Sequence, residues 1–305
     1  MIRPGPHVLS GALKSLERVV EDLKKDLKRI TEGSTPSFRV LKRPSAPINH
    51  LAEEDAAFIE NLEAHNEEAY EMVMALQRSE GSGWKHVVTT PSGVTVETRK
   101  MPTGTFTISS DAAAGEKHAG VKTTGTIKAP PEEVFKLFIN NDRVNEYNEH
   151  IVKIEDVEGV LPTENARDRN GKGLRWTKMA WSSSPRYGPL KARDFLSVVN
   201  FHKRDDGSYV IINRPGYLTT YPVVSKYTRA TVLLAGNIIE PHPMHPNEWT
   251  SLTQIAHVNP GGIADSKIAA SIINSVCAKG PPAFFAGLER AALKTLKQGT
   301  GSAKF

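Results

Sequence analysis

The sequence contains a single cysteine, Cys277, and no long apolar run. One thiol cannot form an intrachain disulfide or a thiolate-rich metal site, and the apolar neighbours of Cys277 predict a small core residue. No stretch approaches the roughly 18 apolar residues of a membrane-spanning helix. The N-terminus lacks the apolar core of a secretory signal, and acidic residues interrupt its bases, unlike an organellar presequence. We therefore expect a cytoplasmic protein.

The sequence also lacks the motifs of common enzyme classes, with no G-x-S-x-G elbow, H-E-x-x-H helix or Walker-type glycine loop. His242 and His245 are three residues apart, but two ligands on a proline-rich loop indicate an exposed turn better than a zinc site. Glu132 and Glu133 follow two prolines and suit the positive end of a helix better than paired acid-base work. We predict no catalytic residue, no metal and no cofactor.

Positive charge is concentrated at one end of the chain. The formal net charge is +5, and residues 1–50 alone carry ten Lys or Arg against five Asp or Glu, so the remainder is neutral. A nucleic-acid binder would be expected to have a basic patch with stacking aromatics across its folded surface, and this pattern is missing. We therefore expect no nucleic-acid partner. The basic arm favours transient peripheral contact with an anionic membrane surface.

Residues 1–33 should form an N-terminal amphipathic helix. Apolar residues recur from Leu9 to Ile30 at alternating spacings of four and three, which places them on one narrow seam. This seam packs either on the chain's own domain or on a partner helix, so a homodimer through residues 9–30 stays open. Gly33 and Pro36 end the helix, and residues 34–50 are predicted to be a linker.

Residues 51–298 should form one α+β domain, followed by a flexible tail at 299–305. A helix is expected over 52–77, a second from Pro130, and a long third from Asp265 to Leu296, kinked at Gly280-Pro281-Pro282. Period-two alternation between them predicts a curved antiparallel sheet of about nine strands, with a hairpin turn at Asp205-Asp206-Gly207-Ser208. The strands are expected near 84–89, 94–99, 104–109, 121–128, 151–160, 174–181, 193–201, 208–213, 229–240 and 249–258.

Several motifs, taken in order over about residues 55–297, resemble START domains, the lipid-transfer domains related to the steroidogenic acute regulatory protein. They are Trp84, Ile127 to Phe135, Arg193-Asp194-Phe195, Arg229-Ala230, Asn259-Pro260-Gly261-Gly262 and the kinked terminal helix. The resemblance implies a helix-grip fold, in which the C-terminal helix covers an apolar cavity. It also implies that the domain binds one sterol, phospholipid, ceramide or similar lipid and transfers it between membranes. Tyr147 and Asn259 depart from the family's usual tryptophan and aspartate.

By this resemblance, Met179 and Val199 fall where the sterol-binding founder of the family has a facing acid and base. Alternation then predicts a largely apolar pocket, in which Thr177 and Ser197 are the nearest polar side chains. A slip of one residue would instead bring Ala180 and either Val198 or Asn200 inward, and the same residues could also be plain core. The predicted ligand-binding residues are Thr177, Met179, Trp181, Phe195, Ser197, Val199 and Phe201 on two strands, and Ile268, Ile272 and Val276 on the terminal helix.

Arg193 and Asp194 are adjacent strand residues, so they point to opposite faces, and a structural salt bridge or turn anchor is expected of them. The loop from Ser182 to Lys191 carries Tyr187 and Leu190, and by family resemblance it is a lid. Two alternative functions remain at this point. One is an enzyme of cyclase or hydrolase type on the same scaffold, which an inward-facing His257 paired with an acid would favour. The other is a lipid-gated protein-interaction module.

Overall fold

The computed structural model describes residues 53–79, 83–101, 118–157, 174–186, 191–219, 221, 223–262 and 280–301. Several predictions lie outside these ranges. They concern the N-terminal helix, the linker, strand 104–109, Cys277, the lid residues Tyr187 and Leu190, and the helix residues Ile268, Ile272 and Val276. Within the described ranges, no helix is long and apolar enough to cross a membrane.

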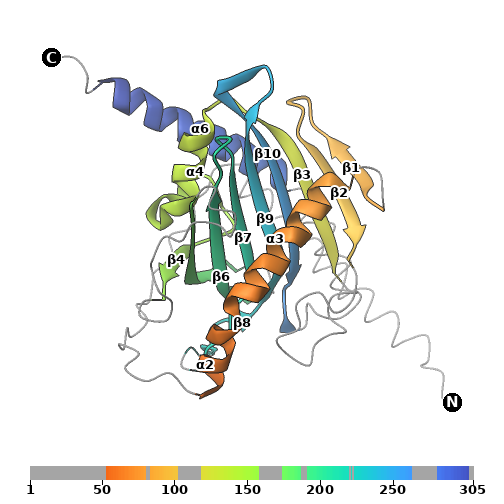
Figure 1. Ribbon diagram of the computed structural model, residues 1–305, viewed down its shortest axis with the longest axis vertical. Coiled ribbons are helices and arrows are strands. Elements are labelled where there is room, and N and C mark those ends of the chain that lie inside the picture. The colour runs from red at the N-terminus through yellow and green to blue at the C-terminus, as the bar shows by residue number, and fades with distance from the viewer. Residues whose placement is uncertain are drawn as a thin grey trace, which may run out of the picture.

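A single ten-stranded sheet forms the body of the domain (Figure 1). Its order is β1-β2-β3-β10-β9-β7-β6-β5-β4, with antiparallel pairing throughout this path, while β8 pairs with β6 in parallel. The predicted antiparallel sheet of about nine strands is therefore confirmed, with the short parallel strand β8 as an addition. The strands are β1 (Lys85–Thr89), β2 (Thr95–Lys100), β3 (Ala119–Ile127), β4 (Lys153–Asp156), β5 (Leu174–Ser183), β6 (Arg193–Lys203), β7 (Tyr209–Pro215), β8 (Thr228–Arg229), β9 (Thr231–His242) and β10 (His245–Asn259).

The helices differ from the predicted ones in three places. The expected helix over 52–77 is divided at Asn61 into α2 (Glu53–Glu60) and α3 (Leu62–Arg78). A 3₁₀ helix, η2 (Asn141–Glu146), follows α4 (Pro131–Ile139) where no element was expected. The C-terminal helix α6 (Pro281–Gly301) extends beyond residue 298.

One face of the sheet, here called the α3 face, is covered by α3, which crosses β7, β9 and β10 in front of the sheet in Figure 1. Ala69, Val73 and Leu76 of α3 belong to one apolar cluster with buried residues of these strands. Gly236 of β9 permits the crossing, because a Cβ there would lie 2.4 Å from Cγ1 of Val73. Each fully buried aliphatic side chain contributes about 1.5–3 kcal/mol to this packing.

The opposite face, here called the α6 face, is covered by α4 and α6, which contact each other (Figure 1). Phe285 and Leu288 of α6 are fully buried in a cluster with Leu252 of β10 and Ile239 of β9. Aromatic rings fill the space under α4, where Phe135 stacks on Tyr209 with 4.2 Å between ring centroids. The sheet is therefore buried on both faces.

Candidate functional site

The strand register defines which side chains share the α6 face. Residues directly opposite in antiparallel strands point to the same side of the sheet. Gln254 of β10 is opposite both Thr123 of β3 and Asn237 of β9, so these three polar side chains form one row. Gln254 lies two residues from Leu252, which packs under α6, and this assigns the row to the α6 face.

The row continues as a diagonal polar band across the neighbouring strands. Asn213 of β7 is opposite Val199, Ser197 of β6 is opposite Ala180, and Ser182 of β5 is two residues from Ala180. Val199 and Ala180 both belong to the apolar cluster beneath α6, so these polar residues share its face. The polar band thus takes one residue from each of six adjacent strands: Thr123, Gln254, Asn237, Asn213, Ser197 and Ser182.

The band retains hydrogen-bonding capacity. Gln254 Nε2 donates a hydrogen bond to Asn237 Oδ1 over 3.2 Å. The side chains of Asn213, Ser197 and Ser182 make no hydrogen bond to the described part of the chain. Each amide can both donate and accept, as can each hydroxyl. The band can therefore bind a ligand group that offers donors and acceptors.

The polar band contains no charged residue. Lys178 lies opposite Val199 on the same face, but its Nζ is 2.8 Å from Asp156 Oδ1 and 3.0 Å from Asn141 Oδ1. The ammonium charge is therefore compensated at the β4 side of the sheet and does not serve the band.

Asp194 and Arg193 anchor the lower end of β6. The Asp194 carboxylate is fully buried and accepts hydrogen bonds from Nε and Nη2 of Arg229 and from Nε1 of Trp181, each at 3.0 Å. The Arg193 guanidinium donates to the carbonyl oxygens of Lys191 and Pro260. Asp194 therefore pairs with the distant Arg229, and Arg193 and Asp194 together fasten β6 to β8 and to the turn after β10.

The predicted ligand-binding set combines two faces of the sheet and is wrong in its β5 half. Met179 pairs with Val198 and Trp181 with Leu196, and all four belong to a cluster with Phe58 and Leu62 on the α3 side. Thr177 is bound there by Asn66 and Asn200. Both faces of β5 are buried, so apolar residues occur on both sides of this strand. Alternation along β5 therefore does not identify the side that faces α6. Phe195, Ser197, Val199 and Phe201 do lie on the α6 face.

Five residues of the polar band were missed by the sequence analysis: Thr123, Ser182 and the three amides. Asn213, Asn237 and Gln254 each lie two residues from an apolar residue of the α6 cluster: Ile211, Ile239 and Leu252. A signal was present, since an amide that interrupts one phase of an apolar strand is unusual in a plain core.

The histidines singled out in the sequence lie away from the polar band. His257 pairs with Leu234, which packs on the α3 side, so it is not the inward-facing residue that an enzyme reading requires. His242 and His245 flank the β9–β10 turn, with 5.9 Å between ring centroids, and His242 Nδ1 accepts a hydrogen bond from the Met244 amide. Met244 is 77% exposed at this tip, in agreement with an exposed turn.

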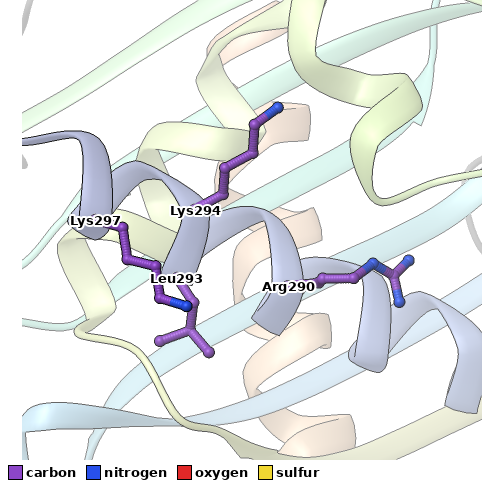
Figure 2. A pocket seen from close by; sticks show the side chains of 4 residues that line it. All are labelled: Arg290, Leu293, Lys294 and Lys297. Carbon is purple, nitrogen blue, oxygen red and sulfur yellow. The ribbon is translucent and has the colours of Figure 1, made fainter.

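The outward side of α6 carries a basic surface (Figure 2). Arg290, Lys294 and Lys297 are spaced by four and three residues, which places them on one side of the helix. They surround Leu293, and Figure 2 shows Leu293 and Lys297 extending in the same direction. Nζ of Lys294 lies 3.7 Å from Glu146 Oε2, so the charge of Lys294 is partly compensated.

Comparisons with known proteins agree with this geometry. No curated protein matches the sequence significantly. Human StAR-related lipid transfer protein 5 superposes with a TM-score of 0.58 at 18% identity, over 77% of this chain and 99% of that one. Human STARD10 gives 0.57 at 15% identity, over 75% and 81%. A STAR-related lipid transfer protein from Xanthomonas axonopodis gives 0.50 at 15% identity, over 69% and 99%.

These structures share the helix-grip fold with the chain, with a large antiparallel sheet and a C-terminal helix across it. The sequence model described as "START domain" matches residues 66–298, which is most of the chain. The protein therefore belongs to the START domain family.

Proposed function

We propose that this protein binds one lipid molecule against the α6 face and carries it between membranes. The observation that carries the proposal is membership of a family whose solved members named above are lipid transfer proteins. Burial of one acyl chain could supply on the order of 10 kcal/mol, at about 0.8 kcal/mol per CH₂, so capture requires few polar contacts. The proposal includes no catalytic step.

Four strand residues on the α6 face are proposed to line the lipid site: Phe195, Ser197, Val199 and Phe201. Ile268, Ile272 and Val276 are proposed to complete it from the terminal helix, with Tyr187 and Leu190 as a lid. These five residues extend the proposal beyond the described part of the chain.

The basic surface of α6 supports transient contact with an anionic, cytoplasm-facing membrane. Each basic residue near such a surface contributes about 1 kcal/mol, and salt screens the attraction. The outward Leu293 adds an apolar contact to Arg290, Lys294 and Lys297. Contact through a helix that also covers the α6 face would couple membrane arrival to lipid exchange.

Native mass spectrometry of the purified full-length protein, followed by analysis of the extracted lipid, tests the proposal. We expect a complex with one lipid per chain, and protein-dependent movement of labelled lipid from donor to acceptor vesicles. A protein that is purified empty and neither takes up nor moves any lipid would exclude the function.

Val199→Arg tests the placement of the site. A guanidinium on the α6 face should strongly reduce uptake of an apolar lipid, because a buried charge has no compensation there. The matched control is Val223→Arg, since Val223 is 52% exposed. Circular dichroism checks that each variant is folded. Unchanged uptake by a folded Val199→Arg protein would show that Val199 does not line the site.

A further inference from the structure

We propose that the polar band selects a lipid with an uncharged, hydrogen-bonding head group, such as a hydroxyl or an amide, over phospholipids. This inference rests on the proposed lipid-binding function. The relevant observation is that six adjacent strands each contribute one hydroxyl or carboxamide side chain to a continuous diagonal line. Their side chains can both donate and accept hydrogen bonds, as a hydroxyl or amide head group requires.

The sheet is less deeply buried on one side of the band than on the other. Ala235 of β9 is opposite both Ala256 of β10 and Asn213 of β7, so two methyl groups adjoin the amide on the α6 face. Ala235, Ala256 and Asn213 are only partly buried, whereas Leu252 and Ile239, on the other side of the band, are fully buried beneath α6. A hydrocarbon chain over the two alanines would bring a neighbouring polar group against Asn213.

The amides of the band have hydrogen-bonding groups that a ligand can use. Asn213 makes no hydrogen bond to the described residues, and the single contact between Gln254 and Asn237 leaves Gln254 Oε1 and Asn237 Nδ2 without a described partner. A ligand hydroxyl could accept from one amide and donate to another. Among the described residues, one hydrogen bond thus accounts for Gln254 and Asn237 only in part, and none accounts for Asn213.

The polar band contains no charged group that could compensate the charge of a ligand. A phosphate moved from water into a partly buried site requires cations or several charge-assisted hydrogen bonds, and an uncompensated charge is costly to bury. Among the described residues, Lys178 is a cation on this face, and it is bound by Asp156 and Asn141. Neutral donors and acceptors alone favour a neutral head group.

Three lipids that share identical acyl chains test the selectivity: dioleoylglycerol, dioleoylphosphatidylcholine and dioleoylphosphatidic acid. The full-length protein is incubated with vesicles that contain all three, re-isolated, and its lipid identified. We expect at least tenfold enrichment of dioleoylglycerol over either phospholipid. Preferential capture of a phospholipid would overturn this inference and leave the proposed function standing. Absence of every lipid, including added cholesterol and ceramide, would instead reject the proposed function.

Asn213→Leu tests the band directly, because leucine has a similar size and no hydrogen-bonding group. We expect about fivefold weaker binding of dioleoylglycerol, the loss that corresponds to one net hydrogen bond. The methyl ether of dioleoylglycerol should bind wild type more weakly but should bind the variant no worse than dioleoylglycerol does. Such coupling between the ligand hydroxyl and Asn213 is not produced by a purely structural role.

The matched control is Asn200→Leu, because Asn200 lies on neighbouring β6 but faces α3, where it binds Thr177. Its lipid preference should equal that of wild type. Ser197→Ala, a milder change in the band, replaces Asn213→Leu if the latter fails to fold, and should lower the enrichment of dioleoylglycerol. Equal losses for all lipids, or no loss in either band variant, would overturn the inference.

Discussion

The two faces of the sheet use polar side chains in different ways. On the α3 face, Asn66 of α3 accepts a hydrogen bond from Arg214 of β7 over 2.9 Å and donates one to Thr177 of β5. On the α6 face, Asn213 and Ser197 of the polar band have no such partners in the described chain. Buried polar groups that bind each other hold elements in register, whereas groups without partners are available to a ligand.

Arg214 illustrates the structural use. It is nearly fully buried beneath α2 and α3, and it donates hydrogen bonds to Asn66 Oδ1 and to the Leu62 carbonyl oxygen. Burial lowers the pKa of Arg214 to about 10, with Glu68 acting in the opposite direction. The free-energy cost of burying this charge is offset because the guanidinium fastens the start of α3 to the sheet. The band on the α6 face contains no comparable buried charge.

The largest effect is expected from Asp194→Asn on the α3 side. Removal of one partner of a buried ion pair leaves Arg229 uncompensated and should lower the free energy of unfolding by about 3 kcal/mol. Urea denaturation measures the change. Asp156→Asn is the matched control, because its partner Lys178 lies in a more exposed pair, and the loss there should stay below about 1 kcal/mol. Equal losses would remove the distinction between the two pairs.

Larger side chains at two adjacent positions of β9 test how tightly each face of the sheet is packed. Gly236→Ala should lower the free energy of unfolding by about 2 kcal/mol, because the new Cβ would overlap Val73. Ala235→Leu, on the partly open α6 face, should reduce lipid uptake with a smaller loss of stability. Calorimetry and a vesicle uptake assay separate the two outcomes. A large loss of stability in Ala235→Leu would indicate that the α6 face is packed as tightly as the α3 face.

Lys297→Ala probes the outer surface of the helix that covers the α6 face. Loss of one base should weaken binding to vesicles rich in phosphatidylserine by about fivefold at low salt, corresponding to roughly 1 kcal/mol. Co-sedimentation measures this binding. Lys85→Ala on exposed β1 is the control and should bind as wild type does. If both variants bind equally, attraction to the membrane does not reside in α6.

The smallest effect concerns pH at the start of α6, where a Cβ on Gly280 would lie 2.9 Å from His150 Nε2. Burial lowers the pKa of His150 below its ordinary 6.5, and Glu149 opposes the shift. The unfolded chain then binds the proton more readily, so stability is complete above pH 6.5 and declines as the pH falls toward the folded pKa. Between pH 7 and 5.5, the hydrogen-exchange protection factors, which correct for the intrinsic exchange rate at each pH, should fall in α6 more than in α3. His150→Gln should abolish this difference, and its persistence would assign the effect to another group.

Much of the fold follows from local sequence signals. The β6–β7 turn has Gly207 at φ +82°, as the Asp205-Asp206-Gly207-Ser208 pattern predicts, and α4 begins at Pro131 with Glu132 and Glu133 in its first turn. The family motifs locate the sheet and the terminal helix. These signals suffice because turns and helix starts depend on neighbouring residues.

The candidate site could be predicted only in part. The sequence predicted correctly which residues of β6 face α6. It failed for β5, because large apolar residues lie on both faces of that strand, with Trp176 on the α6 face and Trp181 on the α3 face. Long-range register decided the outcome, because Val199 pairs with Lys178 and not with Met179. The polar band depends on register across six strands, and no local pattern contains that information.

In the part of the chain that the structure describes, the sheet is open, and its two edge strands have a consequence for solubility. A protein that exposes apolar surface while it exchanges cargo risks pairing edge to edge with another copy. The edge strand β4 has only four residues, of which three are charged, and β1 has a register shift between His86 and Val88. Short, charged or bulged edges are poor templates for an added strand. The sheet on which we propose that lipid binds therefore has borders that disfavour aggregation.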